Sequence, residues 1–399
     1  MEEFAALQGE WEELGTDCSL YSPFACWEWA FSWWKHFGET PPGLGPPQRL
    51  RLLCVRDDQG RLNGIAPFYS RAEGRLSASP RELRMLGDDG RDGEGMTDEP
   101  ILLLRQGCEQ ATLSAMLMHL IGDERHRDKR RRPDFLKLRL QNPEPLLPHG
   151  FALASRGFRT KLHNRWEAVR GDRSAMQWLP GSWLLRTKCQ QGSQAVTLPS
   201  DWAAFRQSLS RSMRDNLSYY PRRLEKDGHA WHIRMASSSQ EVQAALPALV
   251  ALHTDRAQSL RGPKHGSHIP TGRHQGFLAD CLPRMAARGQ AFIGLVVING
   301  EVVAAQIFLE AASTLTLYYS GFRSEWHDYS PLTILHAEII KDALRRGVRH
   351  LNFLPGEMLW KQRWGAKAVG VIEEMTGLHT SPGTLVRMSL RSARRAFLR

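Results

Sequence analysis

Ser330 and Pro331 stand at the start of a predicted helix, and that helix start is the feature of this sequence best suited to bind an anion. A strand at 314–320 precedes them, and 332–346 follows with helical spacing. Serine is a preferred N-cap, and proline is favoured in the first turn. The first amides of a helix lack partners within the helix and lie at its positive end. The sequence therefore predicts a site for an anionic group, such as the pyrophosphate of a nucleotide cofactor, with an ordinary capped helix as the alternative.

Standard catalytic motifs are missing from the sequence. It contains no G-x-S-x-G, no G-x-x-x-x-G-K-[ST] and no H-E-x-x-H, which disfavours a nucleophile elbow, a P-loop nucleotide hydrolase and a zinc protease. The acidic loop 88–99 places carboxylates at several positions of a calcium-binding loop, but its third position, which must supply a ligand, is Gly90. We expect no metal and interpret this loop as a solvated segment, with a carboxylate pair that holds a cationic amine substrate as the alternative.

The composition is that of an ordinary globular chain. Its 399 residues are 42% hydrophobic and 24% charged, and the length favours two domains. No apolar run approaches the roughly 18 to 20 residues that span a bilayer, and the first residues are acidic where a signal peptide would be basic. The six cysteines stand far apart. We expect a cytoplasmic protein without a membrane span, structural zinc or a disulfide framework.

The chain is basic, with 53 Lys and Arg residues against 42 Asp and Glu residues and a net charge of +11. Such an excess favours nucleic acid, anionic lipid or an anionic small molecule as a partner and does not choose among them. Two clusters, 125–132 and the tail 387–399, contribute much of it. Neither alternates with aromatic residues as a base-stacking surface would, so we interpret both as solvated segments.

Strand hairpins recur along the chain and predict an α+β fold. Residues 49–56 and 62–69 alternate as strands around the turn residues 57–60. Residues 291–298 and 302–309 flank Asn299-Gly300, a strong hairpin signal. Other strands are expected at 83–86, 101–104, 135–140, 314–320 and 351–354, and helices at 24–37, 111–121, 200–209, 212–226 with a break or kink at Pro221, 242–260, 276–288 and 332–346.

Both halves repeat the plan of a hairpin, a helix and a further strand. We therefore expect two tandem domains of similar fold, each a mixed, mostly antiparallel sheet flanked by helices. The expected ranges are 1–197 for the N-terminal domain with its connecting segment, 198–378 for the C-terminal domain and 379–399 for the basic tail.

Six segments occur in an order and spacing that resemble a known family. They are W-E-W-A-F-S-W-W-K-H-F, L-L-C-V-R-D-D-Q-G-R-L-N-G-I-A-P-F-Y, L-G-D-D-G, L-S-R-S-M-R-D-N-L, the passage from Y-Y-S-G-F-R to S-P-L-T-I-L, and N-F-L-P-G-E-M-L-W-K-Q-R-W. Together they resemble the acyltransferases named after cellulose biosynthesis, the CelD/BcsL group of the GCN5-related N-acetyltransferase (GNAT) superfamily, over about residues 20–375. The resemblance implies two tandem GNAT-like domains, as in the Fem-type peptidyl transferases, with an acyl-CoA site in the second.

The sequence departs from that family at three points. The superfamily's phosphate loop is rich in glycine, whereas residues 322–331 contain none. Asn352 stands where the family often has Asp, and Trp360 where it often has Tyr. Phosphate binding is therefore expected to depend on the helix start, with Arg323 as a second candidate group. The expected cosubstrate is acetyl-CoA.

Acyl transfer from a thioester asks the protein to position the acceptor, remove a proton and stabilise an oxyanion. Lys361 matches the lysine of the family's Y-K-x-x-W, and we expect a cation there to act near the acyl or phosphate group; the alternative is a solvated surface lysine. The other catalytic candidates are Glu357 and His327 as bases and Tyr319 as a proton donor. Candidates for cofactor binding are Gly321, Arg323, Ser330, Pro331 and Leu332, and those for substrate binding are Gln306, Arg214, Asn216 and Asn352.

The reaction expected from the resemblance is transfer of an acyl group from acyl-CoA to an amino sugar, a polysaccharide precursor or another small amine or hydroxyl. Two other functions stay open. One is Fem-like aminoacyl transfer from charged tRNA, which suits the net charge of +11 and predicts binding that weakens steeply with salt. The other is a degenerate, non-catalytic scaffold of an envelope polysaccharide system, which suits the missing phosphate glycines.

Overall fold

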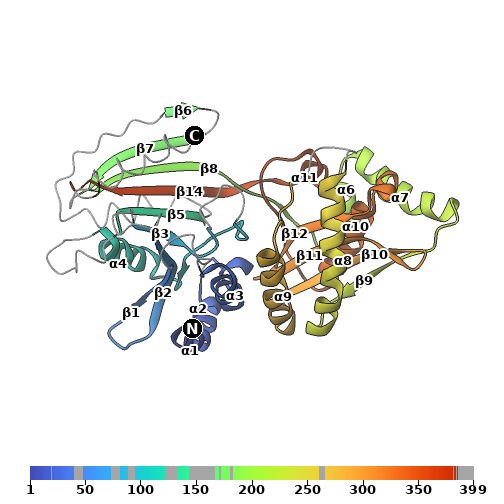
Figure 1. Cartoon of the computed structure of the whole chain (residues 1–399). Helices are drawn as coiled ribbons and strands as arrows, with labels where there is room; N and C mark the ends of the chain where they lie inside the picture. Colours follow the sequence, from blue (N-terminus) through green and yellow to red (C-terminus); the bar gives the residue numbers. More distant parts are fainter. Residues whose placement is uncertain are drawn as a thin grey trace, which may run out of the picture. The chain divides into compact units, whose positions relative to one another are not determined.

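The computed structural model describes residues 1–18, 20–39, 48–72, 81–88, 95–121, 133–142, 167–169, 172–179, 183–259, 266–380, 382 and 384. The chain forms two compact units, drawn in Figure 1. The first contains Met1–Gly192 together with Gly370–Arg399, and the second contains Ser193–Val369. Much of the acidic loop 88–99, the basic cluster 125–132 and the basic tail lie outside the described residues.

The two units divide the chain at other residues than 197 and 378, because two strands serve both. β14 (Lys367–His379) begins in the second unit, and from Gly370 onward it pairs antiparallel with β5 (Phe135–Asn142) of the first. β8 (Trp183–Thr197) begins in the first unit, and its last residues pair antiparallel with β13 (His350–Pro355) of the second. The first unit is therefore completed by a strand from beyond the second unit, whereas the β8 residues that pair with β13 belong to the second unit itself.

The first unit is built around a mixed sheet with the strand order β1-β2-β3-β5-β14-β8-β7-β6, in which β3 and β5 are parallel. The hairpin predicted at 49–69 is confirmed, and Asp57 Oδ1 closes its turn by accepting hydrogen bonds from the amides of Gln59 and Arg61. The remaining elements are α1 (Glu2–Ala6), α2 (Gln8–Thr16), η1 (Pro23–Ala25), α3 (Trp27–Phe37), β1 (Arg49–Arg56), β2 (Leu62–Ala72), β3 (Arg81–Met85), β4 (Leu103–Leu104), α4 (Glu109–Ile121), β6 (Glu167–Val169) and β7 (Asp172–Leu179).

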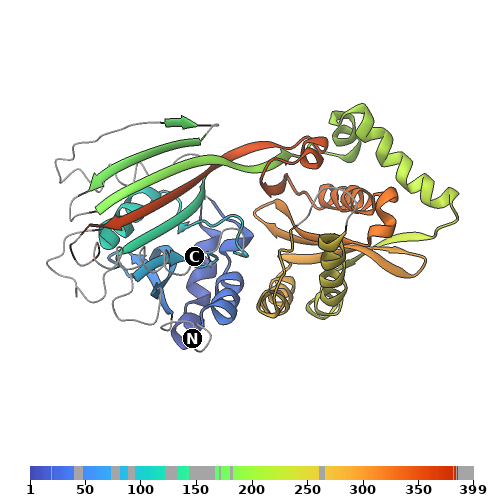
Figure 2. The same ribbon diagram turned by 45° about the horizontal axis from the view of Figure 1, so that its top comes forward.

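The second unit has the strand order β8-β13-β12-β11-β10-β9. Figure 2 shows α10 on one face of this sheet and α8 and α9 on the other. The hairpin predicted at Asn299-Gly300 is confirmed, with Asn299 and Gly300 both at positive φ. The elements are α6 (Trp202–Ser208), α7 (Arg211–Lys226), β9 (Trp231–Ala236), α8 (Ser239–Gln258), α9 (Gly272–Ala287), β10 (Ala291–Ile298), β11 (Glu301–Ala311), β12 (Thr314–Phe322), η3 (Ser324–Tyr329), α10 (Pro331–Arg345) and α11 (Leu359–Arg363).

The same strand arrangement occurs in both units. An antiparallel hairpin leads to a strand that pairs in parallel with a later one, β3 with β5 in the first unit and β12 with β13 in the second. The later strand is then flanked by an antiparallel strand, β14 or the end of β8. The expected tandem α+β fold with mostly antiparallel sheets is therefore confirmed.

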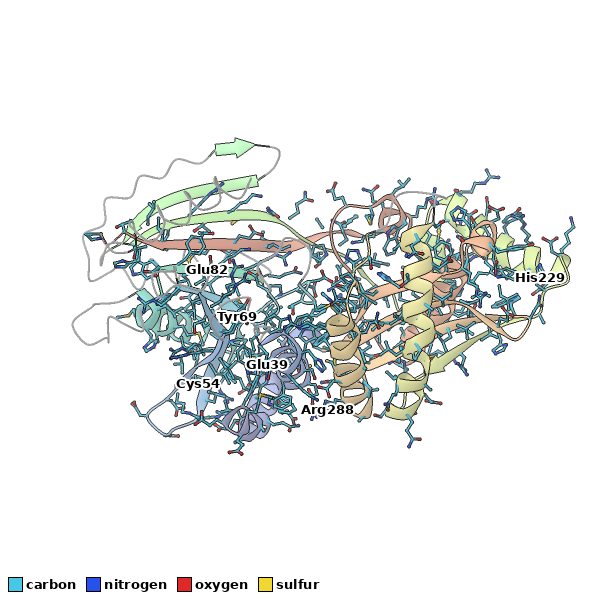
Figure 3. All side chains as sticks on the ribbon, in the orientation of Figure 1. Glu39, Cys54, Tyr69, Glu82, His229 and Arg288 are labelled. Atoms are coloured by element: carbon cyan, nitrogen blue, oxygen red, sulfur yellow. The ribbon has the colours of Figure 1, made fainter. Side chains whose placement is uncertain are left out.

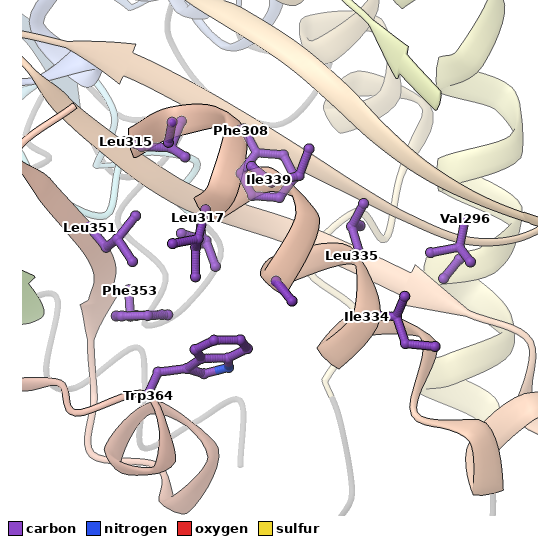
Figure 4. Packing of buried hydrophobic residues seen from close by; sticks show 14 of the residues in the cluster. Val296, Phe308, Leu315, Leu317, Ile334, Leu335, Ile339, Leu351, Phe353 and Trp364 are labelled. Carbon is purple, nitrogen blue, oxygen red and sulfur yellow. The ribbon is translucent and has the colours of Figure 1, made fainter. Parts of the chain in front are cut away.

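The core of the second unit lies between the sheet and α10. Figure 4 shows Leu335 and Ile339 of α10 packed against Phe308 and Leu317 of the sheet, and Trp364 in the same cluster is 2% exposed. Burial of each such side chain contributes roughly 1.5 to 3 kcal/mol. The packing anchors α10 firmly on this face of the sheet.

Two helix expectations need comment. α7 runs from Arg211 to Lys226 with Pro221 inside it, so the helix does not break at this proline. No helix among the described residues is both long and apolar enough to cross a bilayer.

Candidate functional site

The candidate site is the edge of β12 that faces β13. The two strands pair in parallel through only three residue pairs, and the last joins Thr316 to Asn352. β12 continues to Phe322, whereas β13 pairs with β8 on its other side. In the described part of the chain, no strand therefore pairs with this edge of β12 from Leu317 to Phe322. Unpaired backbone groups at such an edge are available to a ligand.

A β-bulge shapes this edge. In the β11–β12 ladder, Gln306 pairs with Ser320 and Phe308 with Leu317, so two residues of β12, Tyr318 and Tyr319, lie opposite a single residue of β11. The two tyrosine rings stack with centroids 3.9 Å apart. Bulges disrupt the ladder locally and re-aim the chain, and they are frequent beside active sites.

Gln306 and His336 hold the bulge from the α10 side. Gln306 Nε2 donates to the Tyr318 carbonyl at 3.1 Å, and Gln306 Oε1 accepts from His336 Nε2 at 2.5 Å. Burial lowers the pKa of His336 to about 3, with the charge of Arg256 as a smaller cause, so the imidazole is neutral and its Nε2 carries the proton. We expected the Gln306 amide to need a substrate or cofactor as its partner. Its partners lie within the protein, and it bears on the site through the bulge.

The buried His336 should make the free energy of unfolding fall as the pH falls. The folded-state pKa of His336 lies below the ordinary value of 6.5, so the unfolded chain binds the proton first as the pH falls. Between pH 6.5 and about 3, His336 should reduce the free energy of unfolding by about 1.4 kcal/mol per pH unit. His336→Gln should flatten the dependence of the melting temperature on pH below 6.5. The matched change at the exposed His232 should leave it as steep as in wild type, and equal slopes for all three proteins would refute the assignment.

Helix α8 closes on β12 from the opposite face. A Cβ at Gly321 would lie 2.2 Å from the backbone nitrogen of His253, so the strand and the helix touch there. His253 Nδ1 donates to the Ser320 carbonyl at 2.9 Å, and His253 Nε2 accepts from the His268 amide at 3.0 Å. Burial is the largest cause that lowers the pKa of His253, which keeps the imidazole neutral. The ring of His268 stacks on that of Tyr319, with centroids 5.2 Å apart.

Lys361 lies in α11 and contacts the end of β13. Its side chain is 4% exposed, and Nζ donates to the carbonyls of Leu354 and Pro355, each at 2.9 Å. Leu354 has φ of +66°, and its amide donates to Asn352 Oδ1 at 2.9 Å. A non-glycine residue in this region costs energy and persists where its surroundings hold it. The alternative of a solvated surface lysine is therefore wrong: Lys361 fixes the turn that ends β13.

The start of α10 leaves backbone donors available. Ser330 has φ of +48° and makes no side-chain cap, contrary to the expectation; its Oγ lies 3.1 Å from Thr333 Oγ1 instead. The Thr333 amide donates to the Ser330 carbonyl. Among the described residues, no acceptor faces the amide of Leu332. With proline at N1, this amide is the first donor that the positive end of α10 can offer.

The segment between β12 and α10 contains no glycine and is held by side chains. It forms η3, which docks on the end of α7: Tyr329 Oη donates to Asp227 Oδ2 at 2.9 Å, and Arg223 Nη1 donates to the Asp328 carbonyl at 3.0 Å. His229, labelled in Figure 3, lies 5.5 Å from Tyr329 by ring centroids. Anchored side chains thus fix the approach to α10 where glycines were expected.

The structure distributes the sequence-predicted residues unevenly. It brings Tyr319 and Gly321 to the edge of β12, Asn352 and Lys361 to the end of β13, and Ser330 with its two successors to the start of α10. Other candidates are exposed or engaged elsewhere. Glu357 and His327 are exposed, and Asn216 is half-buried on α7. Arg323 pairs with Glu301 and Glu325. Arg214 donates to the Gln207 and Leu209 carbonyls.

The sequence analysis did not select His253, Arg256 or His336. Each stands in a regular helical pattern without a motif, so nothing in the sequence distinguishes it from an ordinary helix residue. The bulge is likewise invisible in Y-Y-S-G-F, since register depends on β11. The glycine at 321 was the available signal, because a glycine inside a strand indicates a bulge or a close backbone approach.

Residues 211–362 match the family model described as an acetyltransferase (GNAT) domain. The match begins in α7 and ends in α11, so it contains β12, β13 and the start of α10. The second unit thus carries an acyltransferase domain of the GNAT type.

Solved structures agree on the fold of the whole chain. The chain is similar to the crystal structure of FemX, with a TM-score of 0.56 and 10% identity over 92% of this chain and 95% of that one. It is also similar to a conserved protein of unknown function from Bacteroides thetaiotaomicron, with a TM-score of 0.51 and 10% identity over 93% and 97% of the two chains. Both matches extend through the two units. No curated protein matches the chain.

Proposed function

We propose that the second unit transfers an acyl group from acyl-CoA, with acetyl-CoA as the first candidate, to an amine or hydroxyl of an amino sugar or polysaccharide precursor. The CelD/BcsL-type motifs in the sequence support this acceptor class. The observation that carries the proposal is the bulged, unpaired edge of β12 that leads into an uncapped helix start. An extended pantetheine arm suits such an edge, and a pyrophosphate suits such a helix start.

The residues at the start of α10 fit the phosphates of acyl-CoA, whereas Arg323 does not. The Leu332 amide and the positive end of α10 provide donors for phosphate. Arg323, a candidate phosphate ligand, stands between Glu301 and Glu325 at 3.7 and 3.8 Å, so its charge is already offset. Phosphate recognition on this chain is therefore assigned to backbone donors rather than to Arg323.

The residues of this chain position the reactants and transfer the proton of the acceptor. The bound thioester supplies an acyl group that is already activated, so no covalent residue is needed. The bulge at Tyr318 and Tyr319 aims the β12 backbone, and Gln306 fixes its orientation from behind. Lys361 fixes the end of β13 through its hydrogen bonds to the Leu354 and Pro355 carbonyls. Of the proton-transfer candidates, Tyr319 lies on the bulge, whereas His327 is exposed in η3 and Glu357 is exposed after β13, so we assign proton transfer to Tyr319.

Acetyl-CoA should raise the melting temperature of the protein, because a ligand that binds the folded state stabilises it by about 2.7 kcal/mol at 100 times its Kd. Leu332→Pro removes one amide donor in the first turn of α10, where the N–H has no partner within the helix. Loss of one hydrogen bond to a charged group, about 1.5 to 3 kcal/mol, should weaken acetyl-CoA binding ~10- to 100-fold. Calorimetric titration of the two proteins measures this.

Leu332→Ala is the matched control, since it removes the same side chain and keeps the amide. It should bind acetyl-CoA as wild type does. No binding of acetyl-CoA by wild type at millimolar concentration would reject acyl-CoA as the donor. Salt-sensitive binding of charged tRNA in that case would instead support aminoacyl transfer, which the charge of +11 favours.

A further inference from the structure

Among the described residues, Arg256 has no anionic partner. It lies in the last turn of α8, and its Nη1 donates to Ser320 Oγ at 2.8 Å. No carboxylate among the described residues forms an ion pair with it. The neighbouring Asp255 is engaged elsewhere, since its Oδ2 accepts from the Ser324 amide at 2.8 Å. Arg323 and Arg346 of the same unit, in contrast, each pair with acidic side chains.

The guanidinium of Arg256 lies at the unpaired edge of β12. Ser320 pairs with Gln306 in the ladder, and the side chain of Gln306 is on the α10 face, where it contacts His336. Arg256 starts from α8, on the opposite face. To reach Ser320 Oγ it must pass beside the strand, and β12 has no neighbour there. The Phe322 ring lies 5.3 Å from the Arg256 Cζ atom and supports this path.

The electrostatic effect of Arg256 agrees with this position. After burial, the charge of Arg256 is a further cause that lowers the pKa of His268, on the α8 side, and of His336, on the α10 side. Burial lowers the pKa of Arg256 itself to about 10. The surrounding imidazoles are neutral and provide no compensating charge. A partly desolvated guanidinium is costly until an anion pairs with it, and its planar fork suits a carboxylate or a phosphate.

We propose that Arg256 binds the anionic group, a carboxylate or a phosphate, of the acceptor substrate. The identity of the bound molecule as the acyl acceptor rests on the proposed function; the anion site itself does not. Ser320, which orients Arg256, directly follows the bulge, so the anion would be held next to the place assigned to the thioester. The anion site assigned to the cofactor is a different one, at the start of α10. The stacked rings of Tyr319 and His268 border the Arg256 site and can cover an apolar part of the acceptor.

Two probes distinguish the sources of the anion: inorganic phosphate and acetate, each titrated at constant ionic strength set with sodium chloride. At least one should raise the melting temperature of wild type. Arg256→Gln should lose that rise, or weaken the apparent affinity at least tenfold. Arg345→Gln, which removes an exposed arginine paired with Asp342, should retain it. Equal responses of all three proteins to both anions would overturn the proposal.

A measurement on wild type covers the case in which Arg256→Gln does not fold. Phenylglyoxal modifies arginines, and mass spectrometry follows each one. The effective anion should slow modification of Arg256 several-fold and leave that of Arg345 unchanged; no protection by phosphate or acetate would end the proposal. Acetyl-CoA titrations keep the two hypotheses apart. If acetyl-CoA fails to bind while Arg256 is protected, the anion site stands and the proposed acyl donor falls.

Discussion

Gly321→Ala should destabilise the protein by about 3 kcal/mol and abolish the function of the β12 edge. The new methyl group would lie 2.2 to 2.6 Å from backbone atoms of Leu252 and His253. Because these are backbone atoms of α8, no side-chain rotation relieves the clash, and the helix must move away from the strand. Overpacking of this kind costs about 1 to 3 kcal/mol or more. His253 and Arg256 would leave Ser320 together.

Thermal unfolding should show a lower melting temperature by roughly 2 to 4 °C for each kcal/mol. The anion response assigned to Arg256 should be lost in the same variant. Gly272→Ala is the control, since nothing lies within 4 Å of its added Cβ and it is in α9. It should be neutral or slightly stabilising, because alanine is the better helix former. A fully stable Gly321→Ala protein that keeps its anion response would show that α8 and β12 do not pack as described.

Lys361→Met should reduce both stability and turnover. If Lys361 acted only as a cation near the acyl group, this variant would lower the rate with little change in melting temperature. The structure adds a stability effect, because the buried ammonium donates to two carbonyls and supports Leu354 at positive φ. Each buried carbonyl left without a donor costs about 1 to 3 kcal/mol. Once the turn after β13 relaxes, the side of the site opposite β12 is no longer fixed, and acyl transfer should fall ~30- to 1000-fold.

Lys361→Arg should rescue poorly, since a planar guanidinium cannot take the place of a compact ammonium between two carbonyls. Lys341→Met is the matched control: Lys341 is partly exposed and pairs with Glu338, and such surface pairs contribute about 1 kcal/mol or less. Thiol release and thermal unfolding, measured on the three variants, decide the role. Turnover and melting temperature near those of wild type in Lys361→Met would remove Lys361 from the site.

Local signals in the sequence predicted local structure well. Asn299-Gly300, the 57–60 turn and the Ser330-Pro331 junction gave a hairpin, a second hairpin and a helix start where they were expected. These elements depend on backbone preferences of a few adjacent residues, which single sequences encode.

Long-range pairing limited the prediction of the site. The role of Arg256 depends on Ser320, 64 residues away, and that of Gln306 on His336, 30 residues away. The failed expectation at Ser330 has a similar origin. Its side chain could cap α10 only from an extended conformation, and η3, anchored on α7, delivers the residue at positive φ instead.

The completion of the first unit by β14 has a consequence for synthesis. β5 needs β14 as its neighbour, and the ribosome makes β14 only after nearly all of the second unit. At about 5 to 20 residues per second, the unpaired side of β5 waits roughly 10 to 50 s for its partner. A nascent first unit with an open strand edge is a target for wrong pairing with other chains. Chaperone protection during translation should therefore matter more for this chain than for one whose domains close in the order in which they are made.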